Sequence, residues 1–269
     1  MLFFDPFCGG CNVSFAAKEL GLAVVSSDLF VRAFPDVIQQ DYRNVRFSQG
    51  AIGWLSPPCI DFSSANPKAQ YKDSLLFENP TLSKLDTIFI ENVRGFRAHD
   101  RALEVFASTM GYQYHRSVVD LSDYGAVQSR VRFLACLSRS SSVIERFRNI
   151  PQRVNRENVN RAWFILESMS IESEDDSIPD GFYRRHTGRG VTRYYPKGQT
   201  LPTLTRSNLA RPWALVGRDW RVPTSEIVSI EGFRWEHYSI LDSRALAQSV
   251  VGDGVPYHAA HHILNSVLS

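Results

Sequence analysis

A cysteine, a glutamate and two arginines stand at positions that suit nucleophilic chemistry on an aromatic ring. Cys59 directly follows two prolines after the apolar run 51–55, so we expect its thiol at the mouth of a β-sheet. Glu91 ends a second apolar run, and Arg130 and Arg132 share one face of an extended segment. Alkylation of a pyrimidine at carbon 5 needs a thiol, a carboxylate and paired guanidiniums, because a thiolate must first add to carbon 6 of the ring.

Each of these residues also has a simpler interpretation. Cys59 is the candidate nucleophile, although a lone cysteine is commonly a buried structural residue. Glu91 is expected to protonate or hydrogen-bond ring nitrogen 3; the alternatives are a helix cap or a surface carboxylate. Arg130 and Arg132 would otherwise belong to a solvated edge strand. The occurrence of all four together favours the chemical interpretation.

The elements that must position these residues are short apolar strands separated by helical stretches. This alternation predicts an α/β fold with a mainly parallel sheet. We expect a helix over 12–20 capped by Asn12, and a last helix over 257–268 with one apolar face. The expected strands are 2–4, 23–26, 37–40, 51–55, 87–90, 114–119 and 131–137.

Polar residues collect where these strands end. Ligands of such folds lie outside the carboxyl ends of the strands, so Asp5, Asp28, Asp41, Cys59 and Glu91 are expected in one site. Asp28 would accept hydrogen bonds from ribose hydroxyls, and Asp41 from an adenine amino group. The sequence 7–10, Phe-Cys-Gly-Gly, is a tight turn that lets the backbone approach a ligand.

The composition excludes several classes of protein. A length of 269 residues suits one large domain or a domain with an appendage. No apolar run approaches the ~20 residues of a membrane span, and the N-terminus does not resemble a signal peptide. Four cysteines make no disulfide framework, so we expect a cytoplasmic protein. With a net charge of only +2, nucleic-acid binding must rest on a local basic face.

Taken together, the motifs resemble those of the DNA cytosine-5 methyltransferases, as a short and divergent member. The segments that carry this resemblance are Phe4-Asp5-Pro6-Phe7-Cys8-Gly9-Gly10, Pro57-Pro58-Cys59, Glu91-Asn92-Val93, Gln128-Ser129-Arg130-Val131-Arg132 and Gly252-Asp253-Gly254-Val255-Pro256. The segments 199–205 and 221–233 resemble the family's chain before its last motif.

The resemblance implies a Rossmann-like, S-adenosylmethionine-dependent methyltransferase fold with a small, loop-rich target-recognition domain. Residues 1–138 and 245–269 would form the catalytic domain, and 139–244 the recognition domain. Cys59, Glu91, Arg130 and Arg132 would be catalytic, on a cytosine flipped out of double-stranded DNA. S-adenosylmethionine would contact Phe7, Cys8, Gly9, Gly10, Asp28, Leu29, Asp41, Pro57, Asp253 and Gly254.

The segment 139–197 interleaves arginines with aromatic residues, which suits a surface that follows phosphates and contacts bases. An acidic patch at 172–176 favours a solvated loop for part of it. We expect contacts with DNA from Ser63, Lys68, Lys72, Arg184, Arg185, Arg189 and Arg193. The protein is expected to act as a monomer in restriction-modification or phage DNA modification.

Departures from the family pattern leave alternatives open. The family has Gly at Cys11, Gln at Ile60, Pro at Val127 and Asn at Asp253. The transferred group could therefore be carboxymethyl from carboxy-S-adenosylmethionine. An inactive DNA-binding homologue and a tRNA cytosine methyltransferase are further alternatives.

No metal is expected in this protein. Cys8 and Cys11 could form half of a metal site or a redox pair, but no second cysteine pair completes a zinc site. We expect His258, His261 and His262 to be solvated on the polar face of the last helix.

Overall fold

The computed structural model describes residues 1–30, 34, 36–59, 62, 75–154, 156–157, 159–160, 181–185, 192–196, 200–201, 213–215, 218–220, 252 and 254–269. For the strands between 181 and 220, only the backbone and its pairing are described.

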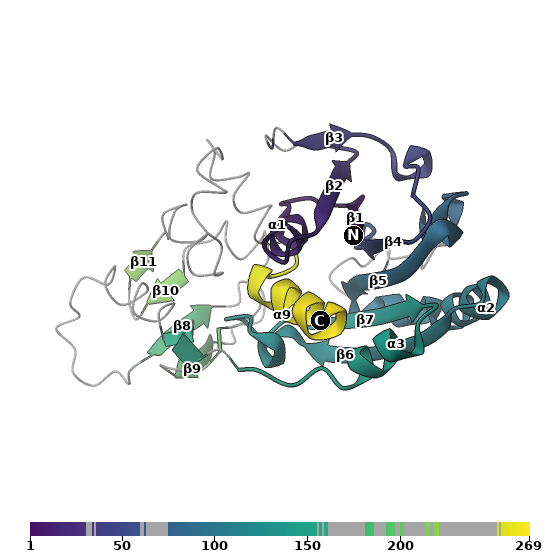
Figure 1. The fold of residues 1–269 in the computed structure, drawn as a ribbon. Helices are drawn as coiled ribbons and strands as arrows, with labels where there is room; N and C mark the ends of the chain where they lie inside the picture. The colour runs from purple at the N-terminus through teal and green to yellow at the C-terminus, as the bar shows by residue number, and fades with distance from the viewer. Residues whose placement is uncertain are drawn as a thin grey trace.

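One seven-stranded sheet, in the order β3-β2-β1-β4-β5-β7-β6, is the centre of the molecule (Figure 1). β7 runs antiparallel to β5 and β6, and the other neighbours are parallel. This arrangement confirms the predicted α/β fold with a mainly parallel sheet. The strands are β1 (Leu2–Asp5), β2 (Ala23–Asp28), β3 (Val37–Gln39), β4 (Ala51–Leu55), β5 (Leu85–Val93), β6 (Gln113–Asp120) and β7 (Val131–Ser138).

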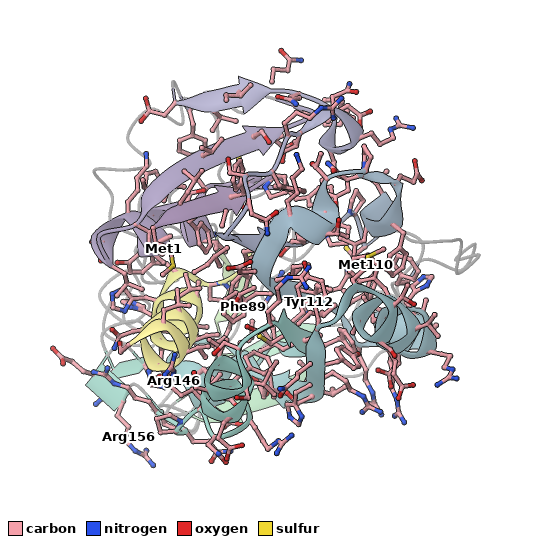
Figure 2. All side chains as sticks on the ribbon, turned by 45° about the vertical axis from the view of Figure 1, so that its right-hand side comes forward. Met1, Phe89, Met110, Tyr112, Arg146 and Arg156 are labelled. Atoms are coloured by element: carbon pink, nitrogen blue, oxygen red, sulfur yellow. The ribbon has the colours of Figure 1, made fainter. Side chains whose placement is uncertain are left out.

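The central strands are buried on both faces, which is why they are continuously apolar. All five residues of β4 are buried. Side chains alternate between two cores in β5: Phe89 packs with Trp54 on one side, while Ile88 and Ile90 join the other. Phe89 is labelled in Figure 2. The strand ends are therefore fixed by packing on both sides of the sheet.

Three helices cover the face that Phe89 points to: α1 (Asn12–Glu19), α3 (Ser141–Arg148) and α9 (Tyr257–Leu268). Arg146 of α3 donates from Nε to the Val267 carbonyl of α9 at 2.7 Å. The residues predicted for the apolar face of α9 are all buried: Ala259, Ala260, Ile263, Leu264 and Val267. The chain end thus returns to the first helix, as Figure 1 shows.

The opposite face is covered by α2 (Asp100–Met110) and by short 3₁₀ helices. These include η1 (Tyr42–Asn44), η2 (Leu75–Glu78), η3 (Leu82–Lys84) and η4 (Arg94–His99). A further 3₁₀ helix, η5 (Leu121–Tyr124), follows β6. η4 continues directly from β5, so it lies next to the end of the strand that carries Glu91.

The start of α1 differs from the prediction. Cys11, with φ 60°, occupies the N-cap position, and Asn12 is the first helical residue. Asn12 instead donates from its buried amide to the Val255 carbonyl at 2.9 Å. The expected capping by Asn12 is therefore wrong, because its side chain is used in a contact with the far end of the chain.

α3 lies within the segment assigned to the recognition domain, yet it packs on the sheet. Ile144, Phe147 and Val159 are buried in the same core as Phe89. We therefore move the proposed start of the recognition domain beyond Val159, and the division of the chain remains a proposal.

Two small antiparallel pairs lie beyond this point. β8 (Gly181–Arg185) pairs with β9 (Thr192–Pro196), and β10 (Trp213–Leu215) with β11 (Arg218–Trp220). In Figure 1 they lie together to one side of the main sheet. None of the helices in the described residues is long and apolar enough to cross a membrane.

Candidate active site

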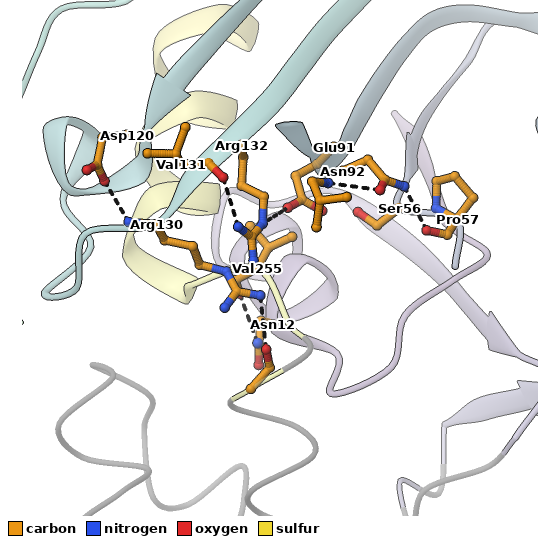
Figure 3. A network of polar contacts seen from close by, with 12 residues as sticks. Asn12, Ser56, Pro57, Glu91, Asn92, Asp120, Arg130, Val131, Arg132 and Val255 are labelled. Carbon is orange, nitrogen blue, oxygen red and sulfur yellow. Dashed lines mark hydrogen bonds and ion pairs between the residues drawn. The ribbon is translucent and has the colours of Figure 1, made fainter. Parts of the chain in front are cut away.

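Cys59 is exposed just past the end of β4. The segment before it is held from two strands. Trp54 donates from Nε1 to Ser56 Oγ at 3.0 Å. Asn92 donates from Nδ2 to the Pro57 carbonyl at 2.8 Å, as Figure 3 shows. The exposure of Cys59 contradicts the alternative of a buried structural cysteine. Its thiol can be reached by a substrate, and the backbone before it is fixed.

Asn92 was not among the predicted site residues, although it stands inside the Glu91-Asn92-Val93 motif. It is 2% exposed, and its Oδ1 accepts from the Val93 N–H at 2.8 Å. A buried asparagine at a strand end needs hydrogen-bond partners for both its amide nitrogen and its amide oxygen, and here the nitrogen bonds the Cys59 segment. This need for partners could have marked Asn92 as a site residue in the sequence.

Glu91 and Arg132 form a buried ion pair. Arg132 Nε lies 3.0 Å from Glu91 Oε1, and the two side chains are 13% and 8% exposed. Glu91 is buried within β5, so it is neither a helix cap nor a surface carboxylate, which were the two alternatives. Arg132 also donates from Nη1 to the Val131 carbonyl at 2.8 Å, so its guanidinium is oriented from two sides (Figure 3).

Arg130 directly precedes β7, which begins at Val131, so only Arg132 of the two arginines lies within the strand. The common face of the two arginines stays a prediction. Arg130 is buried and donates from Nη2 to the Gly252 carbonyl at 3.1 Å. The two arginines therefore serve different partners, one in the carboxylate pair and one in the final motif.

Asp120 holds the corner from which Arg130 projects. Its Oδ1 accepts from the N–H groups of Arg130 at 2.7 Å and of Ser122 at 3.1 Å. Its Oδ2 accepts from Ser129 Oγ at 2.5 Å. A side chain that bonds both branches of a turn fixes the turn's geometry. Asp120 was not among the predicted site residues. An aspartate at the end of a strand is, by itself, only weak evidence for a role in a site.

Leu201 returns to the same corner. Its N–H donates to the Val127 carbonyl at 2.8 Å, and its carbonyl accepts from the Ser129 N–H at 2.7 Å. The segment 199–205 resembles the family's chain before its last motif. Through Leu201, it contacts residues 127–129, which lead to Arg130.

The Phe-Cys-Gly-Gly turn after β1 is tied to the end of β2. Gly9 donates its N–H to Asp28 Oδ2 at 2.9 Å, and Cys8 donates to the Ser27 carbonyl at 3.1 Å. Asp28 Oδ1 accepts from the Phe30 N–H at 3.0 Å. Gly9 has φ 48°, which favours glycine. Leu29 is exposed beside this turn.

Asp41 lies after β3, where it caps η1 and pairs with Arg43 at 2.6 Å. Hydrogen bonds from the Arg43 side chain and backbone lower the pKa of Asp41 to about 2. The carboxylate stays ionised and able to accept. Phe7 stacks on Tyr42 of η1, with ring centroids 4.6 Å apart.

Asp5, at the end of β1, is a further polar group of this region. It is 2% exposed and accepts from Ser14 Oγ at 2.7 Å, and Ser14 in turn accepts from Ser26 Oγ. Burial raises the pKa of Asp5 to about 7, and the nearby charge of Asp28 adds to this effect.

Comparisons with known proteins agree with this geometry. The family model of C-5 cytosine-specific DNA methylases matches residues 28–211, which is more than half of the chain. The chain belongs to the C-5 cytosine-specific DNA methylase family. Type II methyltransferase M.HhaI of Haemophilus parahaemolyticus is 33% identical over 101 residues, which are 34% of this chain and 31% of that protein. The chain thus matches about a third of this curated relative's length.

Solved structures show the same fold. The methyltransferase EhMeth of Entamoeba histolytica has a TM-score of 0.62 at 13% identity, covering 100% of this chain and 98% of that chain. A candidate DNA modification methyltransferase from an Escherichia coli prophage has a TM-score of 0.63 at 16% identity, with coverages of 100% and 98%. DNMT2 of Spodoptera frugiperda has a TM-score of 0.59 at 14% identity, with coverages of 100% and 99%.

The family implies S-adenosylmethionine, and the residues at the strand ends fit it. The carboxylates of Asp28 and Asp41 are acceptors for the hydroxyl and amino groups of adenosine. Asp28 bonds two backbone N–H groups but keeps lone pairs, since a carboxylate has about four acceptor sites. The raised pKa of Asp5 marks a region where negative charge is poorly solvated, which a sulfonium cation would relieve.

Several predicted site residues lie outside the described residues: Ser63, Lys68, Lys72, Arg189 and Asp253. The departure from the family pattern at Ile60 lies outside them too. Gly254 is among the described residues and is half-buried. Arg184 and Arg193 are cross-strand neighbours in the β8–β9 pair, and Arg185 is opposite Thr192.

The part of the chain that the structure describes contains no cluster of His, Cys, Asp and Glu side chains suited to a metal ion. Cys8 and Cys11 are buried, and a hydrogen bond with Cys11 together with burial raises the pKa of the Cys8 thiol. His258, His261 and His262 are half-buried rather than solvated, and His262 Nε2 lies 2.7 Å from the Pro151 carbonyl oxygen.

Proposed function

We propose that the protein transfers a methyl group from S-adenosylmethionine to carbon 5 of a cytosine in double-stranded DNA. The observation that carries this proposal is the bond from Asn92 to the Pro57 carbonyl. It ties the exposed Cys59 segment to the residue next to Glu91. A nucleophile and a paired carboxylate therefore lie together near the carboxyl ends of β4 and β5.

In the proposed reaction, the Cys59 thiolate adds to carbon 6 of a cytosine that has left the base stack. Glu91 holds a proton at ring nitrogen 3, so that the negative charge of the adduct is neutralised there. Arg132 keeps the Glu91 carboxylate in position, and Arg130 keeps Gly252 beside the site. S-adenosylmethionine, when bound, supplies an electrophilic methyl group. Carbon 5 would take this methyl group, with S-adenosylhomocysteine as the leaving group. Loss of the carbon 5 proton to solvent, elimination of Cys59 as thiolate and return of the nitrogen 3 proton to Glu91 would then restore the aromatic ring.

The proposed cofactor site is formed by Phe7, Cys8, Gly9, Gly10, Asp28, Leu29, Asp41, Pro57, Asp253 and Gly254. The proposed contacts with DNA come from two parts of the chain: Ser63, Lys68 and Lys72 after Cys59, and Arg184, Arg185, Arg189 and Arg193. A local set of arginines supports this second proposal, since the net charge of +2 cannot.

The test is to incubate the protein with a duplex DNA and S-adenosylmethionine and to measure nucleosides by mass spectrometry. We expect 5-methylcytosine with the wild type and none with Cys59→Ala or Cys59→Ser, although both variants should still bind the cofactor. A duplex that contains 5-fluorocytosine should be trapped covalently by the wild type. A near-native rate for Cys59→Ala would refute the covalent mechanism.

Further reactions in the same experiment distinguish the alternatives. Carboxy-S-adenosylmethionine tests a carboxymethyl product, and a tRNA transcript tests an RNA substrate. A modified nucleoside found only with one of these partners would replace the proposed function. Cofactor and DNA binding without any modified nucleoside would favour the inactive homologue.

A further inference from the structure

Phe62 follows Cys59 by three residues and is tied to it by a turn. The Phe62 N–H donates to the Cys59 carbonyl at 3.0 Å. The Phe62 side chain is only 5% exposed, whereas Cys59 is exposed. The position of Phe62 therefore limits where the thiol of Cys59 can lie.

Three residues of η4 surround Phe62. The ring of Phe62 packs edge-on against Phe96, with centroids 5.0 Å apart, and against His99, with centroids 4.8 Å apart. A Cβ atom built on Gly95 would overlap the carbonyl oxygen of Phe62. We call Gly95, Phe96 and His99 the Phe62 seat.

Gly95 is required in this seat for space and not for backbone conformation. Its φ lies outside the left-handed region, where other residues are strained. Alanine would therefore be accepted at this position, and would even favour the folded state, if Phe62 did not lie against it. The close approach of the Phe62 backbone is the reason for the glycine.

His99 also contributes to the seat by its shape. It is 7% exposed, and its Nε2 is buried without a hydrogen-bond partner among the described residues. A buried polar atom without a partner is unfavourable, so this nitrogen does not explain the imidazole here. Its ring contacts with Phe62 and Phe96 do.

The Cys59 segment is thus anchored on both sides by one stretch of chain. Asn92 holds the Pro57 carbonyl before the cysteine, and the Phe62 seat holds the turn after it. Both anchors follow Glu91 directly along β5 and η4. We propose that the Phe62 seat positions the Cys59 thiol relative to Glu91, so that Gly95, His99 and Phe62 are positioning residues. This inference rests on the proposed role of Cys59 as nucleophile.

The main test is Gly95→Ala, with Ala98→Ser as the matched control. Both changes add one heavy atom to η4, but Ala98 is exposed. Gly95→Ala should lower kcat for DNA methylation by about tenfold or more, because small displacements of a reacting group are costly. It should slow covalent trapping on 5-fluorocytosine DNA by a similar factor. KM for S-adenosylmethionine should stay within about twofold, because most of the proposed cofactor residues lie at other strand ends and the one that does not, Pro57, keeps its hydrogen bond with Asn92.

His99→Leu and Phe62→Leu complete the test, with melting temperatures and cofactor affinity measured for every variant. His99→Leu should retain most of the rate, because leucine fills the seat without the nitrogen atoms. Phe62→Leu should lose rate less severely than Gly95→Ala, because it keeps an apolar side chain without moving the backbone. A folded Gly95→Ala with unchanged kcat and trapping would overturn the proposal, as would a His99→Leu that loses rate while folded.

A separate measurement keeps the inference independent of the proposed reaction. The rate of Cys59 alkylation by iodoacetamide, followed by peptide mass spectrometry, should change in Gly95→Ala and not in Ala98→Ser. If the wild type neither methylates nor traps DNA, the proposed function fails, and the alkylation rates still decide whether the seat positions the thiol. Equal alkylation rates in both variants would reject the seat.

Discussion

Arg132 Nε lies 3.0 Å from Glu91 Oε1, and both side chains are almost buried. The two residues come from adjacent antiparallel strands, where Arg132 is opposite Val93 and Glu91 is opposite Leu134. The pair is therefore diagonal across the β5–β7 ladder, with the guanidinium extending along the strand towards the carboxylate. A buried charge of either sign depends on its partner in such a pair.

Removal of one partner of this pair should be more damaging than removal of both. Arg132→Met or Glu91→Leu should destabilise the fold by about 3–5 kcal/mol, because each leaves a buried charge uncompensated. The double variant should be more stable than the sum of the single effects predicts. Urea unfolding of all four proteins gives the coupling energy, and an additive cycle would show that the pair is not coupled.

Asp5 should make the stability depend on pH. Burial raises its pKa from 3.8 to about 7, so the folded state binds a proton that the unfolded state releases between these values. Stability from this group is therefore present below about pH 4 and is lost as the pH rises through about 7. The shift corresponds to at most about 4 kcal/mol, at ~1.4 kcal/mol per pH unit.

Asp5→Asn removes this titration and keeps an oxygen for Ser14. The variant should gain stability over the wild type as the pH is raised from 5 to 8. Urea unfolding at these two values measures the gain. An equal difference between variant and wild type at both values would contradict the assigned group.

Cys11 should be a position where glycine is better than alanine. Its φ of 60° costs about 1 kcal/mol for a residue with a Cβ atom, and it occupies an N-cap, where glycine is preferred to alanine. Both substitutions remove the thiol, so their difference isolates the backbone. Cys11→Gly should be more stable than Cys11→Ala by about 1 kcal/mol in thermal unfolding. The reverse order would mean that the backbone relaxes at this position.

Asn12 should connect the first helix to the final motif. Asn12→Ala leaves the Val255 carbonyl without this donor and should cost about 1–3 kcal/mol of stability. Cofactor affinity should fall with it, since Asp253 and Gly254 of the final motif belong to the proposed pocket. Calorimetry of cofactor binding checks this expectation, with the exposed Asn265→Ala as control. A loss of stability with unchanged affinity would remove the final motif from the proposed pocket.

Asp28 and Asp41 should contribute unequally to cofactor binding. Each alanine variant should bind the cofactor about tenfold more weakly, because it removes an acceptor for one hydrogen bond with adenosine. Asp28→Ala should be the more severe, because Asp28 also holds the N–H groups of Gly9 and Phe30. Isothermal titration with S-adenosylmethionine measures both, and DNA affinity serves as the control. Native cofactor affinity in both variants would reject the placement of the pocket.

The central strands and the last helix could be predicted from sequence because their patterns are local. The run 51–55 is β4, and the helix over 257–268 is α9, since continuous burial and a helical period are visible in the residues themselves. The strand-end positions of Asp5, Asp28 and Cys59 followed from the same pattern.

Contacts between distant segments could not be predicted in this way. α3 is short and rich in charge, and its place depends on Ile144 and Phe147 meeting α9 and β5. The turn of Arg130 towards Gly252 joins residues that are far apart in the chain. The left-handed backbone at Cys11 was hidden, because cysteine does not mark that conformation.

The chain leaves the corner after β6 and returns to it at nearly the same point. Arg153 donates its N–H to the Asp123 carbonyl at 2.7 Å, and Leu201 donates to the Val127 carbonyl at 2.8 Å. The segment that joins these residues therefore begins and ends at one corner of the main sheet. A joining segment of another length would change the closure entropy by only ~0.6 kcal/mol per doubling of its length. Replacement of the residues between Val159 and Leu201 should therefore leave the sheet, the thiol and the ion pair in place, whereas Val159 itself has to stay because it is buried in the core.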